Sequence, residues 1–253
     1  MKNLVWFRND LRLHDNPALS QACAKADQVV GIYIVTFKQW EEHNDSPNKI
    51  AFWFRSLIEL QKDLHKLNIP LCILKCDTYD DCPQKILEFA SANEINNLYF
   101  NIEYPVNELK RDEQVQAVLE KMGTSCFSFH DQVIHVPGTL KTKAGTNFSV
   151  YSPFKRCWLA ELDYALLEEH AIPTIKQPVS VNQQDEYDLH SYKQSNINQD
   201  LWPVGEESIQ KMIVNFLDRK GSDYKTDRNF PGLTATSMMS PYINSGVVSS
   251  KWC

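Results

Sequence analysis

Residues 4–19 read LVWFRNDLRLHDNPAL, a short apolar run that passes into a dense set of charged side chains and then into Asn-Pro. The apolar run predicts a buried β-strand over residues 4–7. Asn16 and Pro17 are typical of a helix start, because asparagine caps a helix and proline suits its first position. The intervening charges predict a strand-to-helix loop in which acidic and basic neighbours satisfy one another: Arg8, Asp10, Arg12, His14 and Asp15.

Strand-like and helix-like segments alternate along the first half of the chain. Further apolar or β-branched runs predict strands at residues 29–35, 71–74, 98–100 and 126–129. Helices are predicted from Pro47, with Ser46 as the cap, to about residue 67, and at residues 84–92 and 108–122, the last ending before Gly123. This alternation predicts an α/β fold, a Rossmann-like doubly wound parallel sheet of five strands with helices on both faces.

The second half of the chain is organised differently. Residues 172–205 are rich in Pro, Gln, Asn and Ser and predict a linker, after which residues 206–217 predict a helix with Ile209, Ile213, Phe216 and Leu217 on one side. We therefore expect an α/β domain at 1–135, a connecting helix and linker at 136–204, and the truncated start of a helical domain at 205–253. The end of the chain suggests an element cut short, with exposed apolar surface at Val247, Val248 and Trp252.

Composition excludes several classes of protein. The chain has 253 residues, 43% of them hydrophobic and 23% charged, with a net charge of −6, so a chain-wide positive surface for nucleic acid is absent. No apolar run approaches the roughly 20 residues of a membrane span, and we expect a cytoplasmic protein and a monomer. Seven cysteines without any CxxC pair favour buried thiols over disulfides or a metal site: Cys23, Cys72, Cys76, Cys82, Cys126, Cys157 and Cys253.

Common nucleotide and hydrolase motifs are also missing. The loop after the first strand contains no glycine, so neither a GxGxxG turn nor a P-loop can form there. The sequence has no HExxH and no GxSxG motif. NAD-dependent chemistry, nucleotide hydrolysis and the common hydrolase mechanisms are therefore disfavoured.

As a continuous sequence, WFRNDLRLHDNPAL resembles the opening of the DNA photolyase and cryptochrome family. Residues 32–47 (IYIVTFKQWEEHNDSP) and 101–112 (NIEYPVNELKRD) resemble antenna-binding segments of the folate-type members, closest to bacterial class I cyclobutane pyrimidine dimer photolyases. Residues 151–162 (YSPFKRCWLAEL) resemble the segment that leaves the antenna domain, and Pro153 is expected at the first position of a helix.

The resemblance implies a 5,10-methenyltetrahydrofolate antenna held by His43, Asn107 and Glu108. A carboxylate can accept hydrogen bonds from the amino and ring N–H groups of a pterin, and an amide offers a donor and an acceptor. The residues also have simpler interpretations: Glu108 suits the first turn of a helix, and His43 alone resembles a surface histidine.

Residues 222–253 resemble the start of the family's FAD-binding region. The resemblance implies that Tyr224, Thr236, Ser237 and Ser240 hold the FAD diphosphate, although an ordinary Ser/Thr-rich loop explains them locally. Met238 stands where relatives commonly carry an arginine, which weakens this expectation. Arg228 matches an arginine near the DNA-binding face, and a surface ion pair with Asp227 is the alternative.

The resemblance implies a deoxyribodipyrimidine photo-lyase that repairs cyclobutane pyrimidine dimers in UV-damaged DNA by electron transfer from reduced FAD. Its catalytic residues are expected beyond Cys253, so this chain alone is not expected to repair DNA. Two alternatives remain: a stand-alone folate-binding, light-harvesting module that acts with a separate helical partner, and a cryptochrome-like photoreceptor.

Overall fold

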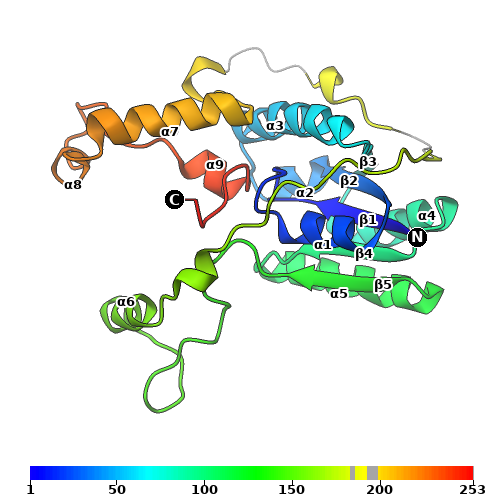
Figure 1. Cartoon of the computed structure of the whole chain (residues 1–253), viewed down its shortest axis with the longest axis horizontal. Helices are drawn as coiled ribbons and strands as arrows, with labels where there is room; N and C mark the ends of the chain where they lie inside the picture. The colour runs from blue at the N-terminus through cyan, green and yellow to red at the C-terminus, as the bar shows by residue number, and fades with distance from the viewer. Residues whose placement is uncertain (183–185, 193–198, 253) are drawn as a thin grey trace.

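The computed structural model describes residues 1–182, 186–192 and 199–252, and its centre is a five-stranded parallel sheet (Figure 1). The strand order is β3-β2-β1-β4-β5, with every neighbouring pair parallel. The strands are β1 (Lys2–Phe7), β2 (Gln28–Thr36), β3 (Leu71–Cys76), β4 (Asn97–Asn101) and β5 (Ser125–Phe129). The predicted fold class and all five predicted strands are confirmed.

Helices cover both faces of the sheet because alternate strand residues point to opposite sides. Val5 and Phe7 pack in one apolar cluster with α1 (Pro17–Lys25) and α3 (Pro47–Lys66). Leu4 and Trp6 pack in a second cluster with α4 (Cys82–Ala92) and α5 (Val106–Met122). The sheet is therefore doubly wound, and its order reverses between β1 and β4.

The helix boundaries follow from the capping residues. The Asn16 side chain accepts a hydrogen bond from the backbone N–H of Leu19 at 3.1 Å, and Ser46 accepts one from that of Lys49 at 3.2 Å. Gly123 ends α5 with a φ of +89°, a conformation that glycine adopts without steric cost. These three predicted boundaries are confirmed.

Short helical elements link the larger ones. They are α2 (Phe37–Glu42), α6 (Tyr151–Ala160) and the 3₁₀ turns η1 (Tyr79–Asp81), η2 (Tyr164–Leu167), η3 (Leu189–Ser191) and η4 (Gln199–Leu201). The expectation that Pro153 occupies the first position of its helix is wrong, because α6 begins two residues earlier, at Tyr151. Proline is tolerated there because the first four N–H groups of a helix have no intrahelical partner.

The described part of the predicted linker lies along the α/β layer. Lys176 N donates to Leu67 O, Gln177 N to Asp27 O and Tyr187 N to Ile73 O, each at 2.9 Å. This linker strap, as we name residues 172–182 and 186–192, is bonded to two connections of the sheet and to its edge strand β3. Residues 183–185 and 193–198 of the predicted linker, and Cys253, lie outside the described residues.

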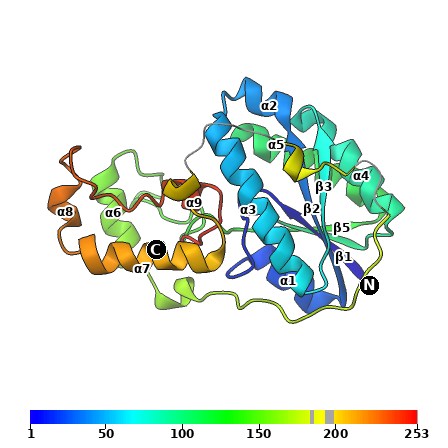
Figure 2. The same cartoon turned by 90° about the horizontal axis from the view of Figure 1, so that it is seen from above.

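The C-terminal helices are α7 (Glu206–Lys220), α8 (Tyr224–Asp227) and α9 (Ser240–Asn244), and they lie to one side of the sheet in both views (Figures 1 and 2). Ile209, Tyr242 and Val248 pack with Phe52 of α3 in a third apolar cluster. The expected exposure of Val247 and Val248 is wrong: Val248 is 3% exposed and Val247 is half-buried, whereas Trp252 is 41% exposed.

Two smaller expectations are also tested. Leu217, predicted on the apolar side of α7, is 60% exposed, whereas Ile209 on the same side is buried in the third apolar cluster. The described cysteines are all free thiols; Cys23, Cys72, Cys76 and Cys82 are buried, whereas Cys126 and Cys157 are half-buried. None of the described helices is long and apolar enough to cross a membrane.

Candidate functional site

The carboxyl edge of the sheet, where the β-strands end, carries a buried network of charges. Arg8 Nη1 lies 3.2 Å from Asp112 Oδ1, and Arg111 Nη2 lies 2.7 Å from both Glu103 Oε2 and Asp112 Oδ1. All four side chains are at most 7% exposed. The network sits where the strand order reverses, between β1 and β4, the usual place for a ligand in open α/β sheets.

The loop between β1 and α1 does not satisfy its own charges, so the sequence-based prediction on this point is wrong. Arg8 pairs with Asp112 of α5, and Arg12 pairs with Asp131, which follows β5. Asp15 pairs with Lys251 at 3.0 Å. These partners lie more than 100 residues away in the chain, so only the folded topology brings them together.

Burial and charge determine the protonation of this network. Burial raises the pKa of Asp10 to about 6, while the neighbouring Arg8 opposes that shift. Burial also acts on Glu103, but the charges of Arg111 and Arg8 outweigh it and hold the Glu103 pKa below its ordinary value. Glu103 is therefore an ionised, paired group at neutral pH.

Aromatic rings and guanidinium groups alternate between the sheet and its carboxyl edge. The guanidinium carbon of Arg8 lies 4.2 Å from the Trp6 ring centroid, and that of Arg111 lies 4.7 Å from it. Arg111 also lies 4.7 Å from the ring of Tyr79. This stacking joins the buried network to the half-buried Tyr79 at the surface.

The structure brings together the three residues predicted to hold a folate. His43 follows α2, whereas Asn107 and Glu108 lie in the first turn of α5, as predicted for Glu108. Asn107 Nδ2 lies 3.5 Å from His43 Nε2, the long end of the hydrogen-bond range. His43 and Asn107 are exposed and Glu108 is half-buried, so their polar atoms are open to a ligand.

Two residues that the sequence analysis did not identify complete this group. The Tyr79 hydroxyl lies 3.3 Å from Glu108 Oε1, and its ring lies edge-on to the His43 ring with centroids 5.8 Å apart. Gln39 Nε2 lies 3.1 Å from His43 Nε2. Tyr79 follows β3 and Gln39 follows β2, so their position after strand ends was the available signal. We call Gln39, His43, Tyr79, Asn107 and Glu108 the edge site.

The four residues predicted to bind the FAD diphosphate are not assembled in this chain. Tyr224 begins α8, at the outer end of α7, whereas Ser240 begins α9, which lies beside its inner end (Figures 1 and 2). Among the described residues no hydrogen bond joins Tyr224 to Thr236, Ser237 or Ser240. Ser240 instead lines a cavity of about 280 Å³ between α3 and α9, which the other three do not line.

Arg228, the predicted DNA contact, is exposed at the end of α8. Its guanidinium carbon lies 5.5 Å from the ring centroid of Tyr224. The alternative interpretation, an ion pair with Asp227, is not found among the described residues. Arg228 therefore has a charge that remains available to solvent or to a partner.

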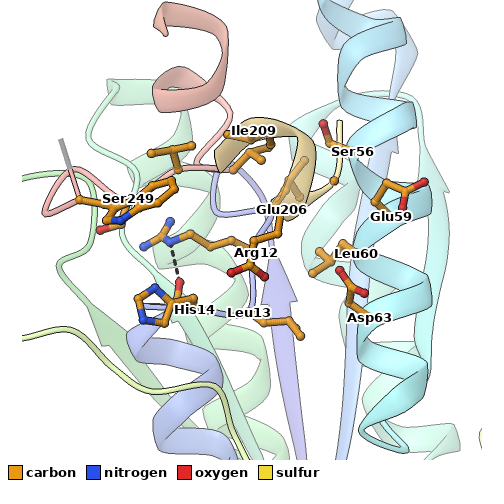
Figure 3. A pocket seen from close by; sticks show the side chains of 15 residues that line it. Arg12, Leu13, His14, Ser56, Glu59, Leu60, Asp63, Glu206, Ile209 and Ser249 are labelled. Carbon is orange, nitrogen blue, oxygen red and sulfur yellow. Dashed lines mark hydrogen bonds between the residues drawn. The ribbon is translucent and has the colours of Figure 1, made fainter. Parts of the chain in front are cut away.

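A smaller cavity lies between α3, the β1–α1 loop and the C-terminal segment (Figure 3). Arg12 Nε donates to the His14 carbonyl oxygen at its edge, opposite Glu59 and Asp63 of α3. Its volume is about 80 Å³, whereas sites for cofactors occupy about 300–1,000 Å³. The cavity is therefore too small for a folate or a flavin.

Comparison with known proteins identifies the family of this α/β unit. The family model described as DNA photolyase matches residues 3–177, well over half of the chain. The chain belongs to the DNA photolyase family. This result confirms the resemblance to this family that the opening sequence indicates.

Relatives named deoxyribodipyrimidine photo-lyase align with the whole chain. The one from Buchnera aphidicola of the aphid Acyrthosiphon pisum is 36% identical over 257 residues, and the one from Escherichia coli K12 is 32% identical over 252 residues. These matches cover 100% and 99% of this chain but 52% and 53% of the relatives. The chain thus spans about half the length of the photolyases that it matches.

A solved structure shows the same fold. The bacterial class III photolyase from Agrobacterium tumefaciens superposes with a TM-score of 0.84 at 26% sequence identity. The match covers 99% of this chain and 51% of that photolyase. The helices that follow the sheet here are therefore part of the shared photolyase architecture.

Proposed function

We propose that this chain is the light-harvesting half of a deoxyribodipyrimidine photo-lyase and that its edge site holds a reduced folate. The observation that carries the proposal is the convergence of His43, Asn107 and Glu108 at the carboxyl edge of the sheet. They come from separate segments that the sequence analysis had associated with one ligand. The proposed division into residues 1–135, 136–204 and 205–253 follows from the same interpretation.

The chemistry of the edge site suits a pterin ring. Glu108 offers a carboxylate at the start of α5, where the helix dipole favours a negative charge. Asn107 offers an amide beside it, and Tyr79 offers an aromatic face against which a planar ring can pack. A methenylated reduced folate bound here would supply near-ultraviolet absorption, while the residues of the edge site bind and orient the ring.

The residues assigned to FAD do not form one site in this chain. Tyr224 lies apart from Thr236, Ser237 and Ser240, and Met238 supplies no cation near a diphosphate. We therefore propose that flavin binding, dimer repair and contact with UV-damaged DNA require a helical half, from the same polypeptide or from a separate partner. Arg228 is proposed to contact DNA phosphate in that larger assembly.

Absorption titration of the purified chain tests this function. We expect 5,10-methenyltetrahydrofolate to bind and FAD, offered separately, not to be retained. Glu108→Gln should weaken folate binding about tenfold, because it removes a charge-assisted hydrogen bond of about 1.5 kcal/mol. Glu113→Gln on the exposed face of the same helix is the matched control and should leave binding unchanged.

Four outcomes would change the proposal. A wild-type chain that binds no folate would contradict the antenna function, and equal binding by Glu108→Gln would remove Glu108 from the site. Light-dependent repair of dimers by this chain alone would contradict the need for a helical half. If a complex with a helical half binds both cofactors but repairs no dimers, the cryptochrome-like photoreceptor becomes the better interpretation.

A further inference from the structure

One backbone amide determines which atoms of the edge site donate hydrogen bonds and which accept them. The N–H of Tyr79 lies 3.1 Å from Gln39 Oε1. A backbone N–H can only donate, so the atom of Gln39 that faces it must be the carbonyl oxygen. The NH₂ group of Gln39 is therefore on the other side, where it lies 3.1 Å from His43 Nε2.

The orientation of the Gln39 amide in turn determines the donor and acceptor atoms of His43 and Asn107. An NH₂ group can only donate, so His43 Nε2 must accept, and the proton of the neutral ring lies on Nδ1. The Asn107 atom 3.5 Å from the same ring nitrogen is Nδ2, because the amide oxygen would repel the ring's lone pair. Asn107 Oδ1 consequently points away from His43.

Tyr79 acts on the remaining member of the edge site. Its hydroxyl donates to Glu108 Oε1 at 3.3 Å. The guanidinium carbon of Arg111 lies 4.7 Å from the centroid of its ring. Burial raises the pKa of Tyr79, so the hydroxyl remains a donor at neutral pH. Within residues 1–182, 186–192 and 199–252, neither Glu108 Oε2 nor Asn107 Oδ1 has a hydrogen-bond donor.

We infer that Gln39 and Tyr79 are positioning residues, which orient the edge site so that its acceptor atoms bind two adjacent N–H donors of a ligand. The site therefore selects a 2-aminopteridine over a flavin-type ring. The inference rests on the proposed antenna function and deepens it. The amino group and the neighbouring ring N–H of a reduced pterin present two donors side by side. The corresponding edge of a flavin or deazaflavin presents carbonyl, N–H and carbonyl, which would place oxygen against oxygen.

The series of hydrogen bonds from the Tyr79 amide through Gln39 to His43 is called the relay below. The tautomer of His43 tests this relay without any ligand. Long-range ¹H–¹⁵N correlation spectra of the chain at about pH 8.5, where an ordinary histidine ring is neutral, distinguish Nδ1–H from Nε2–H. We expect Nδ1–H in the wild type. In Gln39→Glu the side chain can only accept, so the proton should move to Nε2; Gln84→Glu, at an exposed position of α4, should leave it on Nδ1. An Nε2–H wild type, or a tautomer unaffected by Gln39→Glu, overturns the relay.

The relative affinity for a folate and a flavin tests the selectivity that we infer from the relay. We expect the wild type to bind 5,10-methenyltetrahydrofolate at least tenfold more tightly than riboflavin, and Gln39→Glu to lower this ratio about tenfold. Gln39→Met, which removes the relay without adding charge, should also lower the ratio, whereas Gln84→Glu should not. Equal wild-type affinities, or a ratio unchanged in both Gln39 variants, overturn the selectivity. If the wild type binds no folate, the proposed function fails, and the tautomer still decides whether the relay exists.

Discussion

Lys251 Nζ lies 3.0 Å from Asp15 Oδ1, although the two residues are 236 positions apart in the chain. Asp15 also accepts a hydrogen bond from the Ser249 hydroxyl, and its side chain is fully buried. The β1–α1 loop therefore anchors the C-terminal segment to the α/β layer. The local charge pattern of this loop predicts instead that its acidic and basic residues satisfy one another.

Removing the charge of Asp15 should loosen this anchor. We expect Asp15→Asn to lower the free energy of unfolding by about 3 kcal/mol, because it leaves the mostly buried Lys251 ammonium without its carboxylate. Urea unfolding measures the effect. Asp218→Asn, at an exposed position of α7, should change stability by less than about 0.5 kcal/mol, and equal effects of the two variants would disprove the anchor.

Gly246 should not tolerate a side chain. Its φ is +63°, and a Cβ atom would overlap the carbonyl oxygen of Asn9 in the β1–α1 loop. We expect Gly246→Ala to destabilise the chain by about 3 kcal/mol in thermal or urea unfolding. Gly232→Ala is the control, because a Cβ there meets nothing within 4 Å; a loss as large in this variant would contradict the explanation.

Asp10 should give the chain a component of stability that falls as the pH rises. Burial raises its folded-state pKa from an ordinary 3.8 to about 6, so between these values the folded state binds a proton that the unfolded state has lost. Stability should therefore decrease from pH 4 to pH 6, by up to about 3 kcal/mol for this group. The measurement compares the pH dependence of unfolding in wild type and Asp10→Asn. Parallel pH profiles would show that Asp10 does not titrate in this way.

The Tyr79 hydroxyl should contribute to folate binding through Glu108. Tyr79→Phe keeps the ring over Arg111 but loses the hydrogen bond to Glu108 Oε1. We expect the dissociation constant for 5,10-methenyltetrahydrofolate to rise about fivefold, equivalent to about 1 kcal/mol for one neutral donor. Tyr164→Phe is a suitable comparison because Tyr164 is 88% exposed. A Tyr79→Phe affinity equal to that of wild type would exclude this role.

Local sequence signals predicted the secondary structure because their physical causes are local. The caps at Asn16, Ser46 and Gly123 act within a few residues, and strand alternation depends on neighbouring side chains. Ion pairs such as Arg8–Asp112 were not predictable in the same way, because many carboxylates lie more than 100 residues from Arg8. Their choice depends on which loops meet at the carboxyl edge.

The candidate site was only partly predictable for a related reason. His43, Asn107 and Glu108 belong to continuous segments that resemble those of a known family, so they could be identified from the sequence. Tyr79 lies in the three-residue turn η1, and Gln39 lies in the six-residue helix α2, where no motif marks them. Their importance emerges from hydrogen bonds between segments that follow different strands.

The linker strap has a mechanical consequence. Its composition is that of a free tether, but the amides of Lys176, Gln177 and Tyr187 are bonded to three separate places on the α/β layer. Detaching the strap from this layer would have to break these bonds, and slow hydrogen exchange at the three amides would show that they are formed. Residues 172–182 and 186–192 are thus a fixed part of the α/β layer rather than a swivelling joint.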